Sequence, residues 1–127
     1  MLGAGAIRAT TLALLLLLAG AASAAPAPSR IVSTQLCGDQ LLLLLADREK
    51  LASLSYFAAD PNLSGLAARA EGLRRNRGLA EEILPLDPDL VLAGAFTARP
   101  TVFLLRRLGL RVVELPVAAT FEDIRAN

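Results

Sequence analysis

The stretch LAEEILPLDPDLVLAG, Leu79–Gly94, constrains the fold more than any other part of the sequence. Apolar residues with helical spacing lie in its first half, at Leu79, Ile83 and Leu86. Pro85 cannot donate a backbone hydrogen bond, so it is expected to bend or end this helix. After the turn at Asp87-Pro88-Asp89, Leu90–Ala93 is apolar at every position, as in a strand that is covered on both faces. The stretch therefore predicts a short helix that leads into a buried strand.

Other segments repeat this alternation of strand and helix. Runs typical of short strands are found at Arg30–Thr34, Leu51–Leu54 and Val112–Leu115. Loops are expected at Tyr56–Asn62, where Asp60-Pro61-Asn62 has turn chemistry, and at Arg74–Gly78. Strands that alternate with helices favour right-handed crossovers. We therefore predict an α/β fold with a parallel sheet and helices on both faces.

Helices are expected between these strands. Leu41–Ala46 is a continuous apolar run, and we interpret it as a buried helix because Asp39 would suit its first turn. A short helix is expected within Leu63–Leu73. Thr97 is expected to cap a helix that has Pro100 in its first turn. The apolar face of that helix would contain Val102, Leu105 and Leu108, with Gly109 as the residue after its end.

The chain ends with the expected start of another helix. Thr120 is a capping residue, and Asp123 stands where a capping box requires an acceptor. Only about two turns follow before Asn127, and a helix of that length is marginal by itself.

The first 24 residues predict a secretory signal peptide. Arg8 is a thin positive region, Thr11–Ala19 is an apolar segment, and Ala22-Ser23-Ala24 is a small-residue cleavage site. The apolar segment is shorter than the roughly 20 residues that span a bilayer, although a retained anchor is the alternative. We expect the mature chain to begin at Ala25 with a short tether, residues 25–29, and to have no stable membrane insertion after cleavage.

Composition excludes several classes of function. Without Arg8 the chain has twelve basic and twelve acidic residues, so net charge gives no argument for nucleic acid. There is no histidine, which argues against a zinc site and against histidine-based catalysis. Cys37 is the only cysteine, so an intramolecular disulfide is impossible, and we interpret it as an inert small hydrophobe. We expect no metal site, no cofactor and no catalytic residues.

Candidate ligand contacts follow the predicted strands. In a parallel sheet, ligands bind beyond the carboxyl ends of the strands, which are expected at Thr34–Cys37, Ser55–Phe57 and Gly94–Thr97. Aromatic side chains there can stack on a flat ligand, and an amide can hydrogen-bond to it. The candidate ligand-binding residues are Gln35, Tyr56, Phe57 and Phe96. The alternative for each aromatic ring is packing into the core.

Three segments together resemble a known family. They are RIVS at Arg30, NRGLAEEILPLDPDLVLAG at Asn76, and LLRRLGLRVVELP at Leu104. In order and spacing they are similar to the N-terminal lobe of periplasmic substrate-binding proteins of ABC importers for iron-siderophore, haem and cobalamin. Gln40 and Asp47 depart from the residues that this family often has at their positions.

The resemblance implies an organisation and a function. Residues 30–119 would be the N-terminal Rossmann-like lobe, and residues 120–127 would be the truncated start of the helix that bridges to a second lobe. The chain would be a fragment of a non-catalytic periplasmic receptor that delivers a metal-chelate ligand to a membrane permease. Because one lobe presents half of a binding surface, we expect weak or no ligand binding by this chain alone.

The resemblance also implies a role for the acidic residues of the opening stretch. In such proteins a carboxylate at the start of this helix pairs with arginines of the permease. That position corresponds to Glu81, with Glu82 as the less favoured candidate. The alternative is that both glutamates are solvated and stabilise the helix N-terminus.

Other interpretations of the sequence remain open. A basic cluster could face an anionic ligand, although a solvated loop is the simpler account; it comprises Arg69, Arg74, Arg75 and Arg77. A small secreted α/β hydrolase or nucleotide-binding domain is a second hypothesis, but no nucleophile elbow or phosphate loop supports it. A stand-alone interaction domain is a third.

Overall fold

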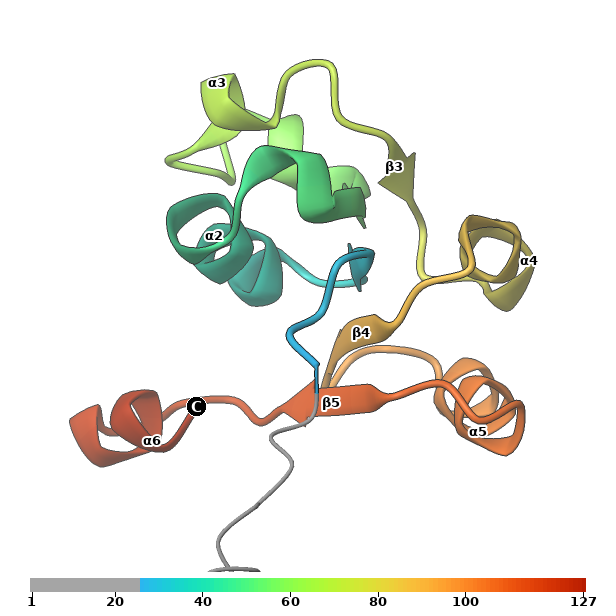
Figure 1. The fold of residues 1–127 in the computed structure, drawn as a ribbon. Coiled ribbons are helices and arrows are strands. Elements are labelled where there is room, and N and C mark those ends of the chain that lie inside the picture. The colour runs from blue at the N-terminus through green and yellow to red at the C-terminus, as the bar shows by residue number, and fades with distance from the viewer. Residues whose placement is uncertain (1–25) are drawn as a thin grey trace, which may run out of the picture.

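A five-stranded parallel sheet forms the centre of the molecule (Figure 1). The structure is a computed structural model that describes residues 26–127. The strands are β1 Ile31–Ser33, β2 Leu51–Ser55, β3 Arg75–Asn76, β4 Leu90–Gly94 and β5 Val112–Leu115. Their order is β3-β2-β1-β4-β5, and every neighbouring pair is parallel. The predicted α/β fold is therefore confirmed.

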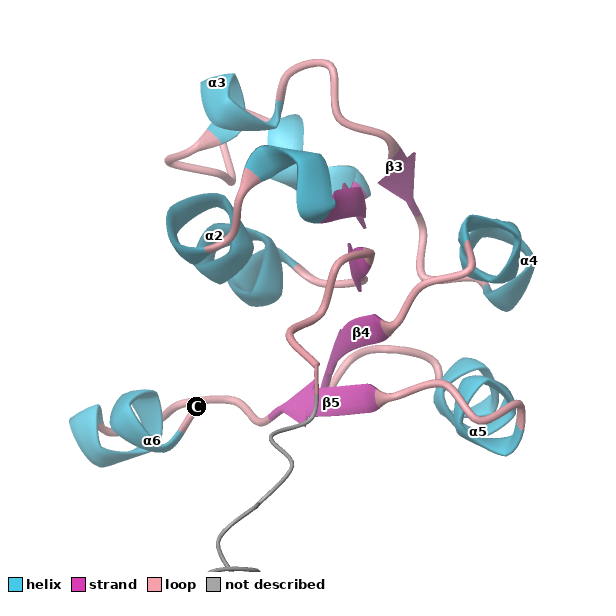
Figure 2. Ribbon diagram, in the orientation of Figure 1, coloured by secondary structure: helices cyan, strands magenta, loops and turns pink. Residues whose placement is uncertain are grey.

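Helices cover both faces of this sheet, as predicted (Figure 2). They are α2 Leu36–Leu45, α3 Ala67–Ala70, α4 Ala80–Ile83, α5 Arg99–Arg107 and α6 Phe121–Ala126. Short 3₁₀ helices occupy Arg48–Lys50, Tyr56–Ala59 and Leu84–Leu86. In Figure 1, α2 lies on one side of the sheet and α4 and α5 lie on the other. The final helix, α6, lies on the side of α2.

The core consists of two apolar layers, one on each face of the sheet. Successive strand residues point to opposite faces, so Ile31 packs with Leu42 and Leu43 of α2. Its neighbour Val32 packs in the other layer, which also contains Val91 and is completed by Ile83 and Leu105. We call this second layer the α5-side core; its buried members are Val32, Ala80, Ile83, Leu86, Val91 and Leu105.

The unit at Leu79–Gly94 folds largely as its sequence predicts. The α-helix ends at Ile83, and the chain continues through a 3₁₀ turn that contains Pro85. Asp87 then adopts a left-handed conformation, with φ of 46°, which reverses the chain. The strand β4 is paired on both edges, with β1 and β5. One detail was wrong: Leu79 precedes the helix and is 44% exposed instead of packing with Ile83.

The prediction of a buried helix at Leu41–Ala46 was only partly right. The helix α2 begins earlier, at Leu36, and Asp39 does lie in its first turn. Leu42 and Leu43 are buried, but Leu44 and Leu45 are 59% and 81% exposed. A helix that packs on one face of a sheet buries one stripe, and a continuous run of leucines conceals where that stripe lies.

The predicted loops contain short regular elements. Arg74–Gly78 includes β3, which pairs with the end of β2 and forms one edge of the sheet. A strand of two residues is too short to give a periodic pattern, which is why the loop prediction was wrong there. In Tyr56–Asn62 the chain forms a 3₁₀ helix first, and the turn at Asp60 follows, with its carboxylate accepting from the Asn62 N–H at 2.8 Å.

The predicted start of α5 was also wrong in detail. Ala98 is its N-cap residue and makes no side-chain cap, whereas Pro100 lies in the first turn as expected. Thr97 is committed elsewhere, because its hydroxyl accepts the Gly94 N–H at 2.9 Å. On the helix itself Val102 and Leu105 are buried as predicted, but Leu108 is 56% exposed.

The predicted helix ends at Gly109 and Thr120 are confirmed. Gly109 has φ of 84°, and the N–H groups of Gly109 and Leu110 donate to Arg106 and Leu105, closing α5 with a Schellman motif. Thr120 and Asp123 form a reciprocal capping box at the start of α6. Both signals depend on a few adjacent residues, so tertiary packing does not override them.

The N-terminal predictions fall outside the described residues. The expected signal peptide and its cleavage site, residues 1–24, and Ala25 lie there. Among residues 26–127, no helix is both long and apolar enough to cross a membrane.

Candidate ligand-binding site

The carboxyl ends of β1, β2 and β3 surround an open pocket of about 400 Å³. Its lining residues are Thr34, Ser55, Tyr56, Phe57, Asn76 and Arg77. Each follows or ends a strand, so the parallel order of the sheet brings together segments that are distant in sequence. This is the edge at which the sequence predicted ligand contacts.

Two predicted aromatic residues stand at this pocket. Tyr56 is 55% exposed and Phe57 is 49% exposed, so neither is a core residue. Their rings lie edge to face, with centroids 6.0 Å apart. The Arg77 guanidinium carbon lies 5.7 Å from the centroid of the Tyr56 ring, within range of a cation–π contact. The pocket thus combines two accessible aromatic rings with one positive charge.

Gln35 and Phe96 lie on the same edge of the sheet but outside the pocket lining. Phe96 follows β4 and is 93% exposed. The Gln35 side chain lies against Gly94, where an added Cβ would come within 2.8 Å of its Cδ and Cγ atoms. Its Nε2 is buried and has no hydrogen-bond partner among the described residues. The structure therefore groups Tyr56 with Phe57 and leaves Gln35 and Phe96 apart from them.

A group of buried polar side chains adjoins the pocket, and two of its members, Ser55 and Asn76, also line it. We call this group the buried polar cluster: Ser33, Asp39, Ser53, Ser55 and Asn76. None of these residues is more than 2% exposed. Asn76 Nδ2 lies 2.9 Å from Ser33 O, 2.8 Å from Ser53 Oγ and 3.0 Å from Leu54 O. Its Oδ1 accepts the Gly78 N–H at 2.9 Å. Asn76 thereby joins β1, β2 and the turn after β3.

Asp39 is the ionisable member of this cluster. Its Oδ1 accepts the Ser55 N–H at 2.9 Å, and its Oδ2 accepts the Ser55 hydroxyl. Burial raises the pKa of the Asp39 carboxyl, and the hydrogen bonds from Ser55 and Ser33 oppose that rise without cancelling it. The sequence suggested Asp39 only as a helix-dipole residue, so its role in the cluster was missed.

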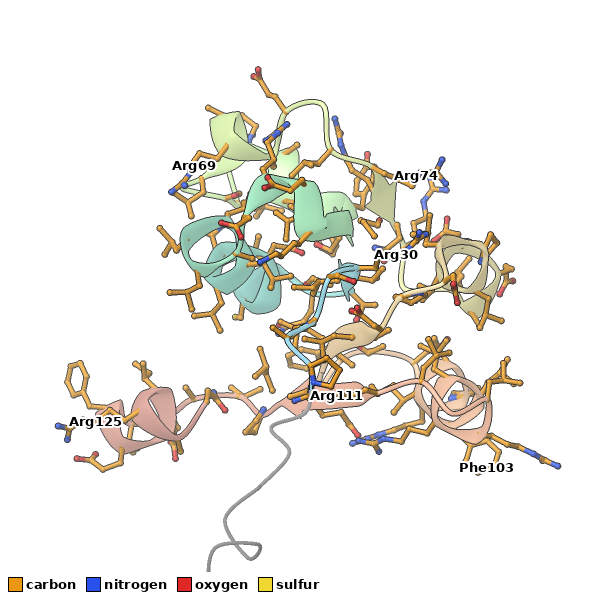
Figure 3. All side chains as sticks on the ribbon, in the orientation of Figure 1. Arg30, Arg69, Arg74, Phe103, Arg111 and Arg125 are labelled. Atoms are coloured by element: carbon orange, nitrogen blue, oxygen red, sulfur yellow. The ribbon has the colours of Figure 1, made fainter. Side chains whose placement is uncertain are left out.

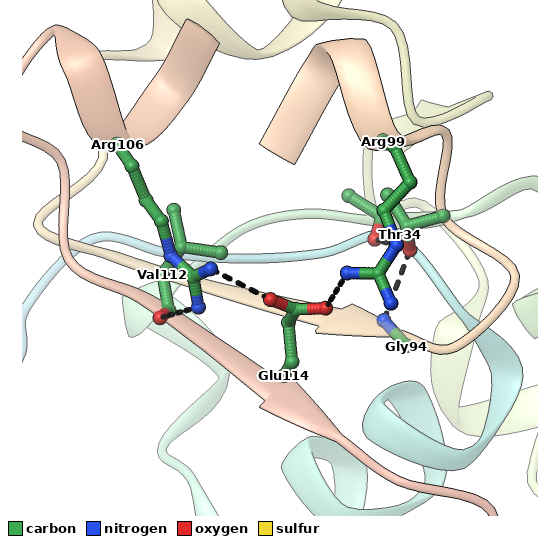
Figure 4. Close-up of polar contacts among 7 residues, drawn as sticks. Thr34, Gly94, Arg99, Arg106, Val112 and Glu114 are labelled. Carbon is green, nitrogen blue, oxygen red and sulfur yellow. Dashed lines mark hydrogen bonds and ion pairs between the residues drawn. The ribbon is translucent and has the colours of Figure 1, made fainter. Parts of the chain in front are cut away.

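The end of β4 is tied to the end of β1 by hydroxyl groups. Thr34 Oγ1 and Thr97 Oγ1 are 3.0 Å apart, and Thr97 Oγ1 also accepts the Gly94 N–H (Figure 4). These bonds fix the loop that carries Phe96 relative to the loop that carries Thr34. The carboxyl edge is therefore held together by polar contacts as well as by the strand ladders.

The basic cluster predicted from sequence does not converge. Arg69 lies on α3 and Arg74 beside β3, well apart in Figure 3. Of the four arginines only Arg77 lines the pocket; it was predicted as a ligand contact only in the less favoured alternative to a solvated loop. Cys37, interpreted from the sequence as an inert small hydrophobe, is exposed on α2. Within the described residues, no group of three or more Cys, Asp or Glu side chains is arranged to hold a metal ion.

A second, smaller hollow of about 190 Å³ lies at the start of β2. It is lined by Leu43, Ala46, Arg48, Leu51 and Arg69. Its Arg48 guanidinium is already used, since it donates to Arg69 O at 2.6 Å and to Glu71 O. These contacts anchor the end of α3, so this hollow is a structural feature at the opposite end of the strand from the candidate site.

The two glutamates of α4 differ in their surroundings. Glu82 Oε2 accepts the Arg77 N–H at 2.6 Å, which ties this side chain to the loop beside the pocket. Glu81 is exposed, and within residues 26–127 no hydrogen bond or ion pair engages its carboxylate. Of the two predicted docking residues, Glu81 is therefore the one available to another molecule.

Comparison with known proteins gives a structural result only. No family model and no curated protein matches the chain. Among solved structures, a periplasmic haem-binding protein from Pseudomonas aeruginosa matches with a TM-score of 0.63 and 22% identity, over 79% of this chain and 36% of that one. A possible iron-binding, periplasmic solute-binding protein from Staphylococcus epidermidis matches with a TM-score of 0.60 and 21% identity, over 76% and 38%.

A third match is the periplasmic vitamin B12 binding protein of Vibrio cholerae, with a TM-score of 0.58 and 25% identity. It covers 78% of this chain and 38% of that protein. The chain thus spans little more than a third of the length of the structures that it matches. Its parallel sheet and flanking helices have the fold of periplasmic haem-, iron- and vitamin B12-binding proteins over that part of their length.

Proposed function

We propose that this chain is the N-terminal lobe of a non-catalytic periplasmic solute-binding protein that captures a metal chelate for an ABC importer. The ligand would be cobalamin, haem or a ferric siderophore. The observation that carries the proposal is the pocket at the carboxyl edge of the sheet, where Tyr56 and Phe57 are accessible beside the Arg77 guanidinium. A flat ligand can stack on such rings, and an anionic group on it can pair with the arginine.

The proposed organisation follows from the same reasoning. Residues 1–24 would be a cleaved signal peptide, 25–29 a tether, 30–119 the lobe, and 120–127 the first turns of a helix that bridges to a second lobe. Two observations support the last assignment. The helix α6 starts with a complete capping box, yet Phe121 and Ile124 are 82% and 61% exposed. The solved structures with this fold are also more than twice as long.

Permease docking is the second element of the proposal. Glu81 lies in the first turn of α4 with an exposed carboxylate that no other residue of 26–127 engages, which suits it for pairing with arginines of a partner. Glu82 is the weaker candidate because the Arg77 N–H already occupies it. A photo-crosslinker placed at residue 81 should label an ABC permease in membranes of the source cell. The same group at Glu122 should not, and equal labelling would contradict the docking role.

Ligand capture can be tested with a probe that the chain already contains. Tyr56 is the only tyrosine and there is no tryptophan, so intrinsic fluorescence reports on the candidate site. Of weak binding and no binding, the accessible pocket favours weak binding by this chain. We therefore expect hemin, cyanocobalamin or ferrichrome to quench this emission at micromolar concentrations and not below, because one lobe covers one side of the ligand. Corrections for absorption by the ligand come from parallel titrations of free tyrosine.

A matched pair of variants makes the test specific. Phe57→Ala should weaken binding by about tenfold, because a stacking ring is lost. Phe103→Ala removes an aromatic ring that is 65% exposed on α5, and it should leave binding unchanged. The proposal fails if none of the three compounds perturbs Tyr56 at about 100 µM, where occupancy would be substantial for a micromolar Kd. It also fails if both variants behave alike.

A further inference from the structure

Asp39 is a fully buried carboxylate whose main partner is Ser55, with a smaller contribution from the Ser33 hydroxyl. Both carboxylate oxygens accept from Ser55, through its backbone N–H and its hydroxyl. Within the described residues, no lysine or arginine pairs with it. An unpaired carboxylate is costly to bury, so a role limited to general packing does not account for it. The specific consequence of its hydrogen bonds lies at Ser55.

Ser55 is the point from which the aromatic part of the pocket begins. It ends β2 and lines the pocket, and the next residue is Tyr56. Residues 56–59 form a 3₁₀ helix whose N-cap, Ser55, makes no side-chain cap to that helix. The Ser55 hydroxyl is directed to Asp39 instead. Asp39 is therefore the side chain that holds Ser55 at the point where the chain leaves β2.

The other partner of the Tyr56 ring is held in a similar way. Arg77 follows Asn76, whose side-chain amide is bonded to β1, to β2 and to Gly78. Tyr56 and Arg77 thus each come directly after a residue that is anchored in the buried polar cluster. Their contact across the pocket depends on both anchors being rigid.

We propose that Asp39 is a positioning residue for the candidate ligand site: its carboxylate fixes Ser55 and thereby the orientation of Tyr56 against Arg77. This inference rests on the proposed function, since it assigns a role in that same site. The contact between Asp39 and Ser55 would preorganise the stacking surface, because the Tyr56 ring would already be ordered before the ligand binds. Loss of the carboxylate should then loosen Tyr56 without unfolding the sheet.

The decisive comparison uses Asp39→Asn and Asp39→Ala in the purified protein without ligand. Asparagine keeps an acceptor for the Ser55 N–H and can donate to the Ser55 hydroxyl, whereas alanine keeps neither. We expect Asp39→Ala to lower the fluorescence anisotropy of Tyr56 and to raise its quenching by acrylamide. Asp39→Asn should restore both values to those of the wild type.

Val102→Ala is the control for stability alone. Val102 is 3% exposed on α5, so its truncation destabilises the protein away from the pocket. Circular dichroism and thermal melts establish that each variant is folded at the temperature of measurement. If Val102→Ala changes Tyr56 emission as much as Asp39→Ala does, or if the two Asp39 variants are alike, the inference is overturned.

Hemin titration supplies the second readout. Asp39→Ala should bind hemin about tenfold more weakly than the wild type, and Asp39→Asn within about twofold of it. If the wild type binds none of hemin, cyanocobalamin and ferrichrome, this result counts against the proposed function. The anisotropy and quenching of Tyr56 in the ligand-free protein would still decide the role of Asp39. Wild-type affinity in Asp39→Ala would refute the positioning role.

Discussion

The buried polar cluster and the α5-side core are both buried, but the first consists of polar side chains and the second of apolar ones. The α5-side core is wholly apolar, and burial of such side chains is a main source of folding free energy. The buried polar cluster contains three serines, an asparagine and a carboxylate, whose hydrogen bonds return little more than the cost of removing them from water. One region therefore supplies stability, and the other fixes the geometry of the pocket beside it.

The largest expected effect is in the α5-side core. Leu105→Ala removes a side chain that is 1% exposed and should lower the free energy of unfolding by about 3 kcal/mol. Denaturation in urea measures this change. Leu108→Ala on the same helix is the matched control, because Leu108 is 56% exposed and should cost less than about 0.5 kcal/mol. Similar losses would mean that α5 does not pack as described.

The next effect concerns Asp39. Asp39→Ala leaves the buried Ser55 N–H and hydroxyl without an acceptor and should cost about 2 kcal/mol in the free energy of unfolding. Because burial raises the Asp39 pKa in the folded protein, the folded state binds the proton more tightly than the unfolded state. The stabilisation from that proton is complete below the ordinary value of 3.8 and is lost as pH rises through the folded pKa.

Asparagine at position 39 does not titrate, so the Asp39→Asn variant tests the direction in which the Asp39 contribution to stability changes with pH. The stability of Asp39→Asn relative to the wild type should therefore increase from acid to neutral pH. The difference between the two proteins removes the opposite contributions of Asp47, Asp89 and Asp123, whose pKa values are lowered by hydrogen bonds. The free energy of unfolding of both proteins is measured by denaturation from acid to neutral pH. If the value for Asp39→Asn minus that for the wild type stays constant or decreases, Asp39 is not a buried, ionisable carboxylate.

A smaller effect is expected at the boundary between the two regions. Gly94→Ala would bring a Cβ within 2.8 Å of Gln35, whose side chain must then move. The cost should be about 1 kcal/mol, because overpacking is relieved in part by a flexible side chain. The double variant Gly94→Ala with Gln35→Ala should recover most of that loss. Absence of recovery in a double-mutant cycle would show that Gln35 does not lie against Gly94.

The smallest effect is expected at the surface of α5. Glu114 Oε2 lies 2.6 Å from Arg99 Nη1, and its Oε1 lies 2.8 Å from Arg106 Nη1 (Figure 4). Both arginines are more than half exposed, so Glu114→Gln should cost about 0.5 kcal/mol at low salt. The difference should disappear in about 1 M salt, where charges are screened over a few ångströms. A loss that persists in salt would show that Glu114 acts through packing.

Local sequence signals predicted the order of elements well. The strands β1, β2, β4 and β5 and the capping box at Thr120 were all predicted, because each depends on adjacent residues or on burial of a whole strand. Errors arose where a distant contact decides the outcome. The Thr97 hydroxyl lies 3.0 Å from that of Thr34, 63 residues earlier in the chain, and does not cap α5. The strand β3 exists because β2 provides a partner for two residues.

In the candidate site, too, residues that depend on local signals were predicted, and residues that depend on distant contacts were not. Tyr56 and Phe57 could be predicted because they directly follow a strand whose carboxyl end lies at the ligand edge of a parallel sheet. Arg77 could not be singled out from the other arginines of the predicted basic cluster, since its position over the Tyr56 ring depends on the pairing of β3 with β2. The roles of Asp39 and Asn76 were equally hidden, because their partners are 16 and up to 43 residues away in sequence.

The sequence by itself determined the α/β class, the parallel sheet and the edge of that sheet at which the candidate pocket lies. These follow from periodicity and from the geometry of crossovers, which are properties of short segments. Only the tertiary structure decided which leucines of α2 are buried, which glutamate of α4 bonds to the Arg77 N–H, and which polar residues are buried beside the pocket. Those outcomes depend on strand order and on hydrogen bonds between distant segments, and no local pattern in the chain encodes either.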